Sequence, residues 1–352
     1  MSASVHAPRD ANNFDLIRFV LAVVVFLFHA GGLTGRPELA PLSRLISAEF
    51  AVQAFFVVSG YLIFMSYERS GTLGQYFERR VRRIYPAYAF VVLACAAGGL
   101  ALTRLPAGDY LASPGLLRYL GWNLVFLNFL QPTLPGVFEA NPLTVVNGAL
   151  WTLKVEVSFY LSVPVLAWLF RRLPRPACIA ALYLLSVAFT LGLRELAGNA
   201  ALLDKLQYQL PGQLTYFLAG AMFYYYPPGR RLALGLAVAA LPLLLLEGPL
   251  QVLLRPLAVG AVVHYLALGM PYLGNFGRHG DFSYGVYILH FPILQALVAL
   301  GAFGASAWTG MALALVLVPV AAWISWRWIE KPFLRRASHY VAAEDAPPEA
   351  RP

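Results

Sequence analysis

Charged residues are scarce in this sequence. Only 12% of its 352 residues are Asp, Glu, Lys or Arg, whereas a soluble domain usually carries about 25%. Hydrophobic residues make up 59% of the chain, and its mean hydropathy is +0.65. So little charge is not enough to solvate the surface of an ordinary soluble enzyme of this length. The chain is therefore expected to be solvated mostly by lipid.

Cysteine is also rare, since only Cys95 and Cys178 are present and both lie in apolar stretches. Two such residues cannot form a metal cluster, and we interpret them as small buried hydrophobic side chains. Acidic residues are outnumbered by basic ones, 17 against 26. In a membrane protein such an excess marks cytoplasmic loops rather than a nucleic-acid site, so neither a metal nor a nucleic-acid partner is expected.

Long apolar stretches, by contrast, recur along the whole chain. Each has 17 or more residues, which is enough to cross a hydrocarbon core of ~30 Å as a helix. We therefore predict an all-α polytopic membrane protein with about ten transmembrane helices. The predicted spans are 14–32, 50–67, 84–104, 149–170, 176–194, 206–226, 231–247, 249–270, 281–302 and 307–329.

A further apolar stretch at 116–130 is shorter, and the distribution of Lys and Arg decides whether it crosses the membrane. With a cytoplasmic N-terminus and no crossing there, seventeen basic residues fall in cytoplasmic segments and six in outer loops. A crossing would move the three arginines of 171–175 outside and remove this positive-inside bias. We therefore predict ten crossings in the inner (plasma) membrane, both termini in the cytoplasm, and a short outer or re-entrant segment within 105–148.

The two ends of the chain complete the predicted organisation. The first span has the length of a signal peptide, but no small-residue cleavage site follows an uncharged core, so we expect it to be retained. We predict an integral membrane domain over 1–337 and a disordered cytoplasmic tail over 338–352, because the last residues are polar and rich in Pro, Ala and Glu.

Arg18 and His29 interrupt the first span, in LIRFVLAVVVFLFHAGG (16–32). They are eleven residues apart, which on an α-helix is roughly 1100°, or ~20° beyond three full turns. Both therefore lie on one helix face, about 16 Å apart along the axis. Alone, Arg18 could extend to the interface and His29 could cap a helix. However, a charge inside a span costs at least ~2.5 kcal/mol and normally faces a polar cavity, so the shared face predicts a polar path.

Four arginines fall within five residues in YFERRVRRIYP (76–86), just before the third predicted span. Positive-inside anchoring explains some of this charge. Guanidinium groups packed so densely outside the bilayer also suit the phosphates of a bound ligand. Pro86 follows directly and could provide a turn or kink that holds the cluster near the membrane entrance.

WTLKVEVSFY (151–160) places Lys154 and Glu156 in the outer half of a span. At positions i and i+2 they point to different sides of the helix, so Glu156 needs a partner on another helix. His29 is at comparable depth, and a histidine oriented by a carboxylate is the arrangement that general-base catalysis uses. A purely structural His–Glu hydrogen bond would have the same sequence signature.

SYGVYILHFPI (283–293) places Tyr284, Tyr287 and His290 deep in another span. Aromatic side chains in such positions are usually packing residues. His290 costs desolvation energy there, and we expect it to line the same cavity.

These motifs occur in one order: FDLIRF…FHA, FFVVSGYLI, ERRVRRIYPAY, LWTLKVEVSFY, FSYGVYILHFPI and a closing IEKP. In this order, from residue 14 to about 333, they resemble the acyltransferase-3 family of membrane-bound O-acyltransferases. The resemblance implies about ten transmembrane helices. It also implies an enzyme that takes an acyl group, commonly acetyl, from cytoplasmic acyl-coenzyme A and places it on a hydroxyl of a glycan or another acceptor.

The resemblance also implies roles for individual residues. The family's motifs match Arg18 and His29, then Arg79, Arg80 and Arg83, and then Trp151 and Glu156. By this resemblance the catalytic residues would be His29, Glu156 and Arg18, and the coenzyme A phosphates would bind Arg79, Arg80 and Arg83. Together with Tyr287 and His290, singled out above by their depth in a span, Trp151 would belong to the substrate site. In this hypothesis His29, oriented by Glu156, removes a proton from the acceptor hydroxyl. The family commonly has Ser where this chain has Thr152, a conservative change.

The expected partners are acyl-CoA, with acetyl-CoA as the favoured form, a glycan or lipid-linked sugar acceptor, and the lipid bilayer. Acyl-CoA is expected as a co-substrate, and no permanently bound cofactor is predicted. No GxSxG motif is present, so a covalent acyl-enzyme is not indicated. Intramembrane charges also mark transporters, and a transporter or exporter of a polar or acylated substrate is the alternative. Transporters often contain inverted repeats, and none is visible here. A scaffold in glycan assembly would leave the buried His and Glu residues unexplained.

Overall fold

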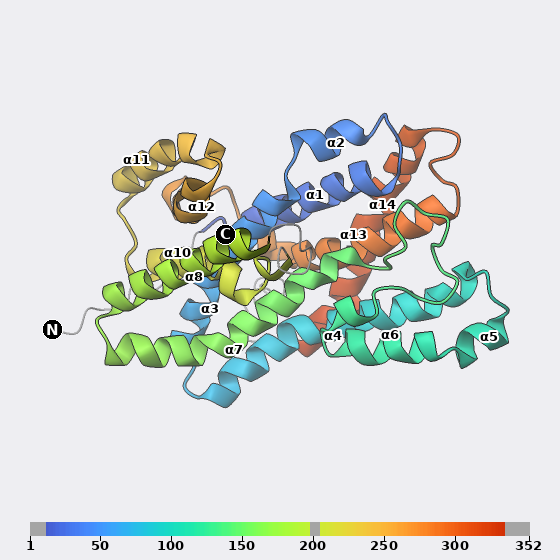
Figure 1. Cartoon of the computed structure of the whole chain (residues 1–352), viewed down its shortest axis with the longest axis horizontal. Helices are drawn as coiled ribbons and strands as arrows, with labels where there is room; N and C mark the ends of the chain where they lie inside the picture. Colours follow the sequence, from blue (N-terminus) through green and yellow to red (C-terminus); the bar gives the residue numbers. More distant parts are fainter. Residues whose placement is uncertain (1–11, 198–204, 335–352) are drawn as a thin grey trace, which may run out of the picture.

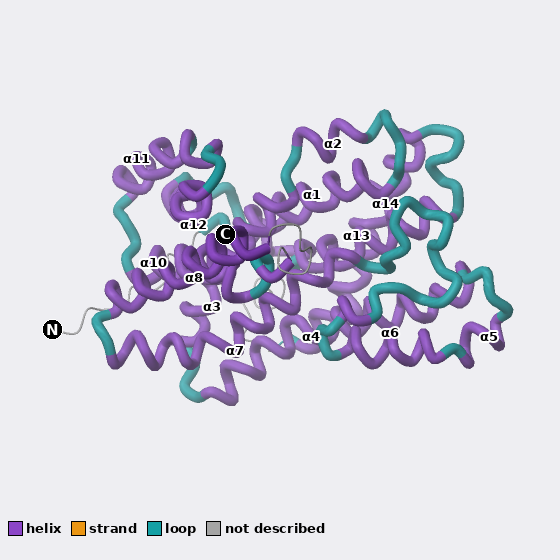
Figure 2. Tube along the Cα trace, in the orientation of Figure 1, coloured by secondary structure: helices purple, strands orange, loops and turns teal. Residues whose placement is uncertain are grey.

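The computed structural model describes residues 12–197 and 205–334. Over these residues the chain consists of helices joined by loops and contains no strand (Figures 1 and 2). This confirms the predicted all-α polytopic fold. The tail predicted over 338–352 lies outside the described residues.

Eight helical segments in the described part of the chain are long and apolar enough to cross a membrane. Several of them consist of an α-helix extended by a 3₁₀ or π turn. They are α1 (Phe14–Leu33), α3 (Ala48–Glu68), α4 (Leu73–Leu102), η2 and α7 (Gly148–Leu150 and Trp151–Arg172), α8 (Arg175–Ala197), α12 and η4 (Pro249–His264 and Tyr265–Gly269), α13 (Phe282–Ala299), and α14, η6 and η7 (Ala307–Ile324, Ser325–Glu330 and Lys331–Phe333).

The other two predicted spans form shorter helices than expected. α10 (Leu210–Tyr225) has 16 residues and α11 (Arg230–Ala240) has 11, followed by a 3₁₀ turn, η3 (Pro242–Leu245). At a rise of 1.5 Å per residue these α-helices are about 24 Å and 17 Å long, so neither reaches the ~30 Å of a hydrocarbon core. The sequence therefore overestimated the length of both.

Contacts between helix ends show that consecutive long helices alternate in direction. Near the start of α1, Arg18 pairs with Asp281, which directly precedes α13. At the end of α3, Glu68 accepts a hydrogen bond from Tyr225 at the end of α10 and pairs with Arg171 at the end of α7. We call the side on which these ends lie the basic face, because the arginines of the loop between α3 and α4 and of the start of α4 are also there.

Contacts at the opposite face complete the alternation. Arg36, which follows α1, donates to the backbone carbonyl of Phe303, which follows α13. The chain then returns to the basic face at the end of α12, where the side chain of Asn13 donates to the carbonyl of Leu266 at 3.1 Å. The described chain thus begins and ends at the basic face, in agreement with the predicted alternation of ten segments.

The segment between α4 and α7 is re-entrant. After α5 (Ala107–Ala112), α6 (Pro114–Leu124) turns back along α4 (Figure 1). The Tyr88 hydroxyl donates to the carbonyl of Asn123 at 2.7 Å, so the end of α6 lies beside Tyr88 of α4. Tyr88 is about 21 Å along the helix from the end of α4 at Leu102. A 3₁₀ turn, η1 (Asn128–Leu130), and a loop then lead back to α7. Since α4 ends and α7 begins at the same face, the segment does not cross.

Close packing of α3 and α10 holds the shorter helix in place. A Cβ atom on Gly60 would lie 2.0 Å from the carbonyl oxygen of Phe217, and one on Gly220 would lie 2.0 Å from that of Val57. Only glycine permits this approach, in which the two backbones meet directly. Such small-residue contacts are a common way for membrane helices to associate, because lipid provides no hydrophobic driving force between them.

Candidate active site

A groove with a volume of about 500 Å³ opens on the basic face. We call it the basic vestibule, because five arginines of the loop between α3 and α4 and of α4 line it. They are Arg69, Arg79, Arg80, Arg82 and Arg83. The predicted arginine cluster therefore lines a cavity, although α4 begins at Leu73 and continues through Pro86, so the cluster lies on the helix itself and not before it.

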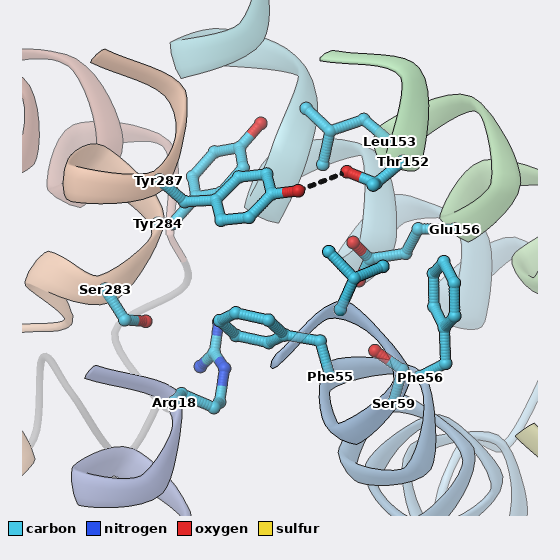
Figure 3. A pocket seen from close by; sticks show the side chains of 11 residues that line it. Arg18, Phe55, Phe56, Ser59, Thr152, Leu153, Glu156, Ser283, Tyr284 and Tyr287 are labelled. Atoms are coloured by element: carbon cyan, nitrogen blue, oxygen red, sulfur yellow. Dashed lines mark hydrogen bonds between the residues drawn. The ribbon is translucent and has the colours of Figure 1, made fainter. Parts of the chain in front are cut away.

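A smaller cavity of about 60 Å³ lies deeper, between α1, α3, α7 and α13. We call it the inner chamber; Figure 3 shows its lining side chains. Four residues line both the chamber and the vestibule, namely Arg18, Ser59, Glu156 and Tyr284. The two cavities are therefore neighbours that share one polar boundary, and together they form a path from the basic face toward the interior.

Asp281 organises the charges beside this path. It caps α13, where its carboxylate accepts hydrogen bonds from the backbone N–H of Ser283 at 3.0 Å and from its hydroxyl. The other carboxylate oxygen accepts from Arg18 at 2.5 Å and from Arg83. Burial raises the pKa of Asp281, but Arg18 and Arg83 more than offset this and hold that pKa well below its usual range. The carboxyl group is therefore an anion.

Arg83 is also paired a second time, with Glu330 at 3.2 Å, and Glu330 accepts a hydrogen bond from Ser325 at 3.1 Å. The acidic residues in this cluster thus compensate the charges of Arg18 and Arg83. Arg83, predicted to bind phosphate, belongs to an ion-pair network that joins α4, the start of α13 and η6.

The other arginines of the vestibule are in a different situation. Among the described residues, no carboxylate pairs with Arg69, Arg79 or Arg80. Arg80 donates to the hydroxyl of Ser66 at 3.2 Å, but its buried Nε has no hydrogen-bond partner in the described part of the chain. An unsatisfied buried donor is costly, and an anion in the vestibule would satisfy it.

Glu156 faces both cavities from α7 (Figure 3). The hydroxyl of Tyr160 donates to it at 2.6 Å. Pro164 has no N–H to bond the carbonyl of Tyr160 four residues earlier, and the hydroxyl of Tyr76 donates to that carbonyl instead, at 3.0 Å. In the described part of the chain, no hydrogen bond joins Glu156 to His29. The prediction that Glu156 orients His29 directly was therefore wrong.

The partner of His29 is His290. His29 Nδ1 and His290 Nε2 are 2.9 Å apart, and the ring planes are inclined by 26°. Arg18 and His29 therefore both contact the α13 side, as their predicted common face requires. His290 is completely buried, whereas His29 is partly exposed.

Neither histidine lines the two cavities, but Tyr287 lies between His290 and the inner chamber. Its hydroxyl is hydrogen-bonded to that of Thr152 at 2.7 Å in the wall of the inner chamber (Figure 3). Its ring lies 6.1 Å from that of His290, centroid to centroid. Trp151, the other predicted substrate residue, is not among the cavity-lining residues and packs edge-on against Tyr208.

Sequence reasoning missed three residues of this region. Asp281 and Glu330 are the buried acids of the ion-pair network, and Arg69 lines the vestibule. A local signal exists for Asp281, because Asp-x-Ser at a helix start is a capping pattern. For Glu330 the signal is its place in the closing IEKP motif.

Comparison with known proteins places this sequence in a family. A family model described as an acyltransferase domain, that of acyltransferase-3, matches residues 12–327. The chain belongs to this family. It is therefore a membrane-bound O-acyltransferase, which agrees with the prediction and disfavours the transporter alternative. No solved structure matches the chain.

Three similar proteins match this acyltransferase over most of their length. Nodulation protein 10 of Rhizobium leguminosarum bv. viciae is 28% identical, over 96% of this chain and 97% of that protein. An O-acetyl transferase of Shigella phage Sf6 is 25% identical, over 93% and 97%. The exopolysaccharide production protein ExoZ of Rhizobium meliloti is 28% identical, over 88% and 95%.

Proposed function

We propose that this acyltransferase moves an acetyl group from cytoplasmic acetyl-CoA to a hydroxyl of a cell-surface glycan or of its lipid-linked precursor. The single observation that carries the proposal is the path from an arginine-lined vestibule, past Arg18 and Glu156, toward the pair of His29 and His290. The names of the phage O-acetyl transferase and of the exopolysaccharide protein support acetyl as the group and a glycan as the acceptor.

The donor would bind from the basic face, which we assign to the cytoplasm from its excess of Lys and Arg. Arg79 and Arg80, with Arg69, would bind the coenzyme A phosphates, because their charges have no carboxylate partner in the described chain. Arg83 would hold the wall of the vestibule through its ion pairs.

The pantetheine arm would extend along the α13-facing side of α1. Arg18 and Glu156 line the boundary between vestibule and chamber, where they can hydrogen-bond amide groups of the arm. Arg18 and His29 are about 16 Å apart along the helix, so an arm that passes Arg18 brings the thioester toward His29. Tyr287 would contact the substrates from the wall of the inner chamber.

The reaction then needs one base. His29 takes the proton of the acceptor hydroxyl as the oxygen attacks the thioester carbonyl carbon. The new C–O ester bond forms, the C–S bond breaks, and the coenzyme A thiolate leaves and receives the proton from the His29 imidazolium. No oxidant or metal takes part in this balance.

Mass spectrometry of surface glycans tests the proposal. Cells with this protein should carry glycans that are heavier by acetyl groups than those of cells without it or with the variant His29→Ala. Purified protein should release free coenzyme A from acetyl-CoA only when an acceptor glycan is present. Identical glycans in all three strains, together with no thioester cleavage, would contradict the proposal.

A further inference from the structure

The histidine pair has one atom whose hydrogen-bonding role is fixed. His290 Nδ1 lies 3.0 Å from the backbone carbonyl oxygen of Val286, one turn earlier in α13. A carbonyl oxygen can only accept a hydrogen bond, so Nδ1 carries the hydrogen and donates it. In a neutral imidazole the other nitrogen, Nε2, is then an acceptor.

This assignment determines the tautomer of His29. Its Nδ1 lies 2.9 Å from the accepting Nε2 of His290, so His29 Nδ1 donates. The hydrogen of neutral His29 is therefore on Nδ1, and its Nε2 has a free lone pair. A general base needs this lone pair, and in the opposite tautomer Nε2 would carry a hydrogen.

We propose that His290 is a positioning residue that fixes the tautomer and orientation of His29. This rests on the proposed function, in which His29 is the base. His290 takes the place that a carboxylate occupies behind the histidine of a Ser–His–Asp triad. Among the described residues no carboxylate hydrogen-bonds His29.

A neutral imidazole suits this depth better than a carboxylate. His290 is completely buried, and an ion without a counter-ion costs several kcal/mol in such a place. As a neutral acceptor, His290 provides the hydrogen bond without an isolated charge. It also stabilises the imidazolium that forms on His29, because a hydrogen-bond acceptor interacts more strongly with a charged donor.

Aromatic rings pack around both imidazoles. The ring of Phe291 packs edge-on against His29, with centroids 5.1 Å apart. Gly148 leaves the room for it, since a Cβ there would lie 2.7 Å from the Phe291 ring. Phe26 and Tyr287 pack against His290, each with ring centroids 6.1 Å from it. The pair is therefore held as a unit.

Two nearly isosteric variants test the inference. His290→Gln keeps a polar acceptor about as far from the backbone as Nε2, whereas His290→Met has similar length and no such group. We expect His290→Met to lower kcat for acetyl transfer about 10²-fold or more, with KM for acetyl-CoA unchanged, and His290→Gln to recover most of the loss. Equal kcat in the two variants, or a change in KM alone, would overturn the inference.

A double variant separates this role from an independent one. If His290 acts through His29, then His29→Ala with His290→Met should be no slower than His29→Ala alone, because residues that act as a unit are not additive. A further loss in the double variant would overturn the inference. Full activity of His29→Ala would instead contradict the proposed function. Protein abundance and coenzyme A binding identify variants that fail to fold. If His290→Met fails to fold, the kcat of His290→Gln relative to wild type decides: a kcat close to wild type supports the inference, and a loss of about 10²-fold overturns it.

Discussion

The side-chain amide of Asn147 donates a hydrogen bond of 2.8 Å to the backbone carbonyl of Ile288. In an uninterrupted helix the N–H of residue 292 would satisfy this carbonyl, but Pro292 has no N–H. Asn147, just before α7, therefore completes the hydrogen bonding of α13 two residues from His290. Pro292 removes a backbone hydrogen bond and Asn147 replaces it, so the two residues together fix the α13 backbone next to His290.

The first prediction follows from this hydrogen bond between Asn147 and Ile288. Asn147→Leu should destabilise the protein by about 1–3 kcal/mol, because the buried carbonyl of Ile288 loses its partner. Adding Pro292→Leu restores an N–H at position 292 and should recover much of this loss. The melting temperature in detergent measures both effects. If the double variant is less stable than Asn147→Leu, the carbonyl is not the cause.

The second prediction separates the arginines of the vestibule. Arg80→Lys keeps the charge but loses the forked geometry, so it should raise KM for acetyl-CoA. A charge-assisted hydrogen bond is worth about 1.5–3 kcal/mol, which corresponds to tenfold or more. Arg83→Lys should instead lower thermal stability, because it weakens the pairs with Asp281 and Glu330. If the two variants exchange these effects, the assignment of roles is wrong.

Sequence periodicity could predict that Arg18 and His29 share a face, because this property depends only on the helix that contains them. It could not predict their partners. Asp281 and His290 are 263 and 261 positions away, and only the packing of α1 on α13 brings them close. From the sequence, only a comparable depth in the membrane relates Glu156 to His29, and the structure pairs His29 with another imidazole instead.

The lengths of α10 and α11 were missed for another reason. Mean hydropathy measures how apolar a stretch of sequence is, but it carries no information on the residue at which a helix begins or ends. The predicted span 231–247 includes Pro242, before which α11 ends and a 3₁₀ turn follows. The predicted span 206–226 begins four residues before the helix, which starts at Leu210. Apolarity thus identified both segments but not their helical extent.

The third prediction concerns pH. Asp281 has its pKa lowered in the folded state despite burial, because Arg18 and Arg83 outweigh the desolvation. Its contribution to stability is therefore fully present above the unfolded pKa of about 3.9 and is lost as the pH falls from there through the lower folded value. Asp281→Asn should be less stable at neutral pH by about 3–5 kcal/mol, since the partly buried guanidinium groups of Arg18 and Arg83 lose a carboxylate partner.

Melting temperatures of both proteins between pH 3 and pH 7 check this prediction. The difference between wild type and Asp281→Asn should narrow toward the acid end of that range. A difference that stays constant or grows as the pH falls would show that Asp281 is not the titrating group.

The fourth prediction concerns topology. A reporter fused after residue 145, in the loop that returns from the re-entrant segment, should be outside. One fused after residue 229, between α10 and α11, should be cytoplasmic. Alkaline phosphatase and green fluorescent protein fusions report the two sides. Cytoplasmic signals at both sites would contradict the alternation of helix ends at the basic face.

The last prediction compares Glu156→Gln with His29→Ala. Glu156 lines both cavities and accepts from Tyr160, but it does not hydrogen-bond His29. If Glu156 contacts the donor arm, Glu156→Gln should mainly raise KM for acetyl-CoA, because the amide keeps the size but loses the charge. His29→Ala should lower kcat about 10²–10⁴-fold, the usual contribution of a general base, and leave coenzyme A binding unchanged. Steady-state kinetics and calorimetric titration with coenzyme A measure these quantities. A large loss of kcat in Glu156→Gln with unchanged KM would show that Glu156 acts in the chemical step. Glu156 and His29 would then have to come into contact when the substrates bind.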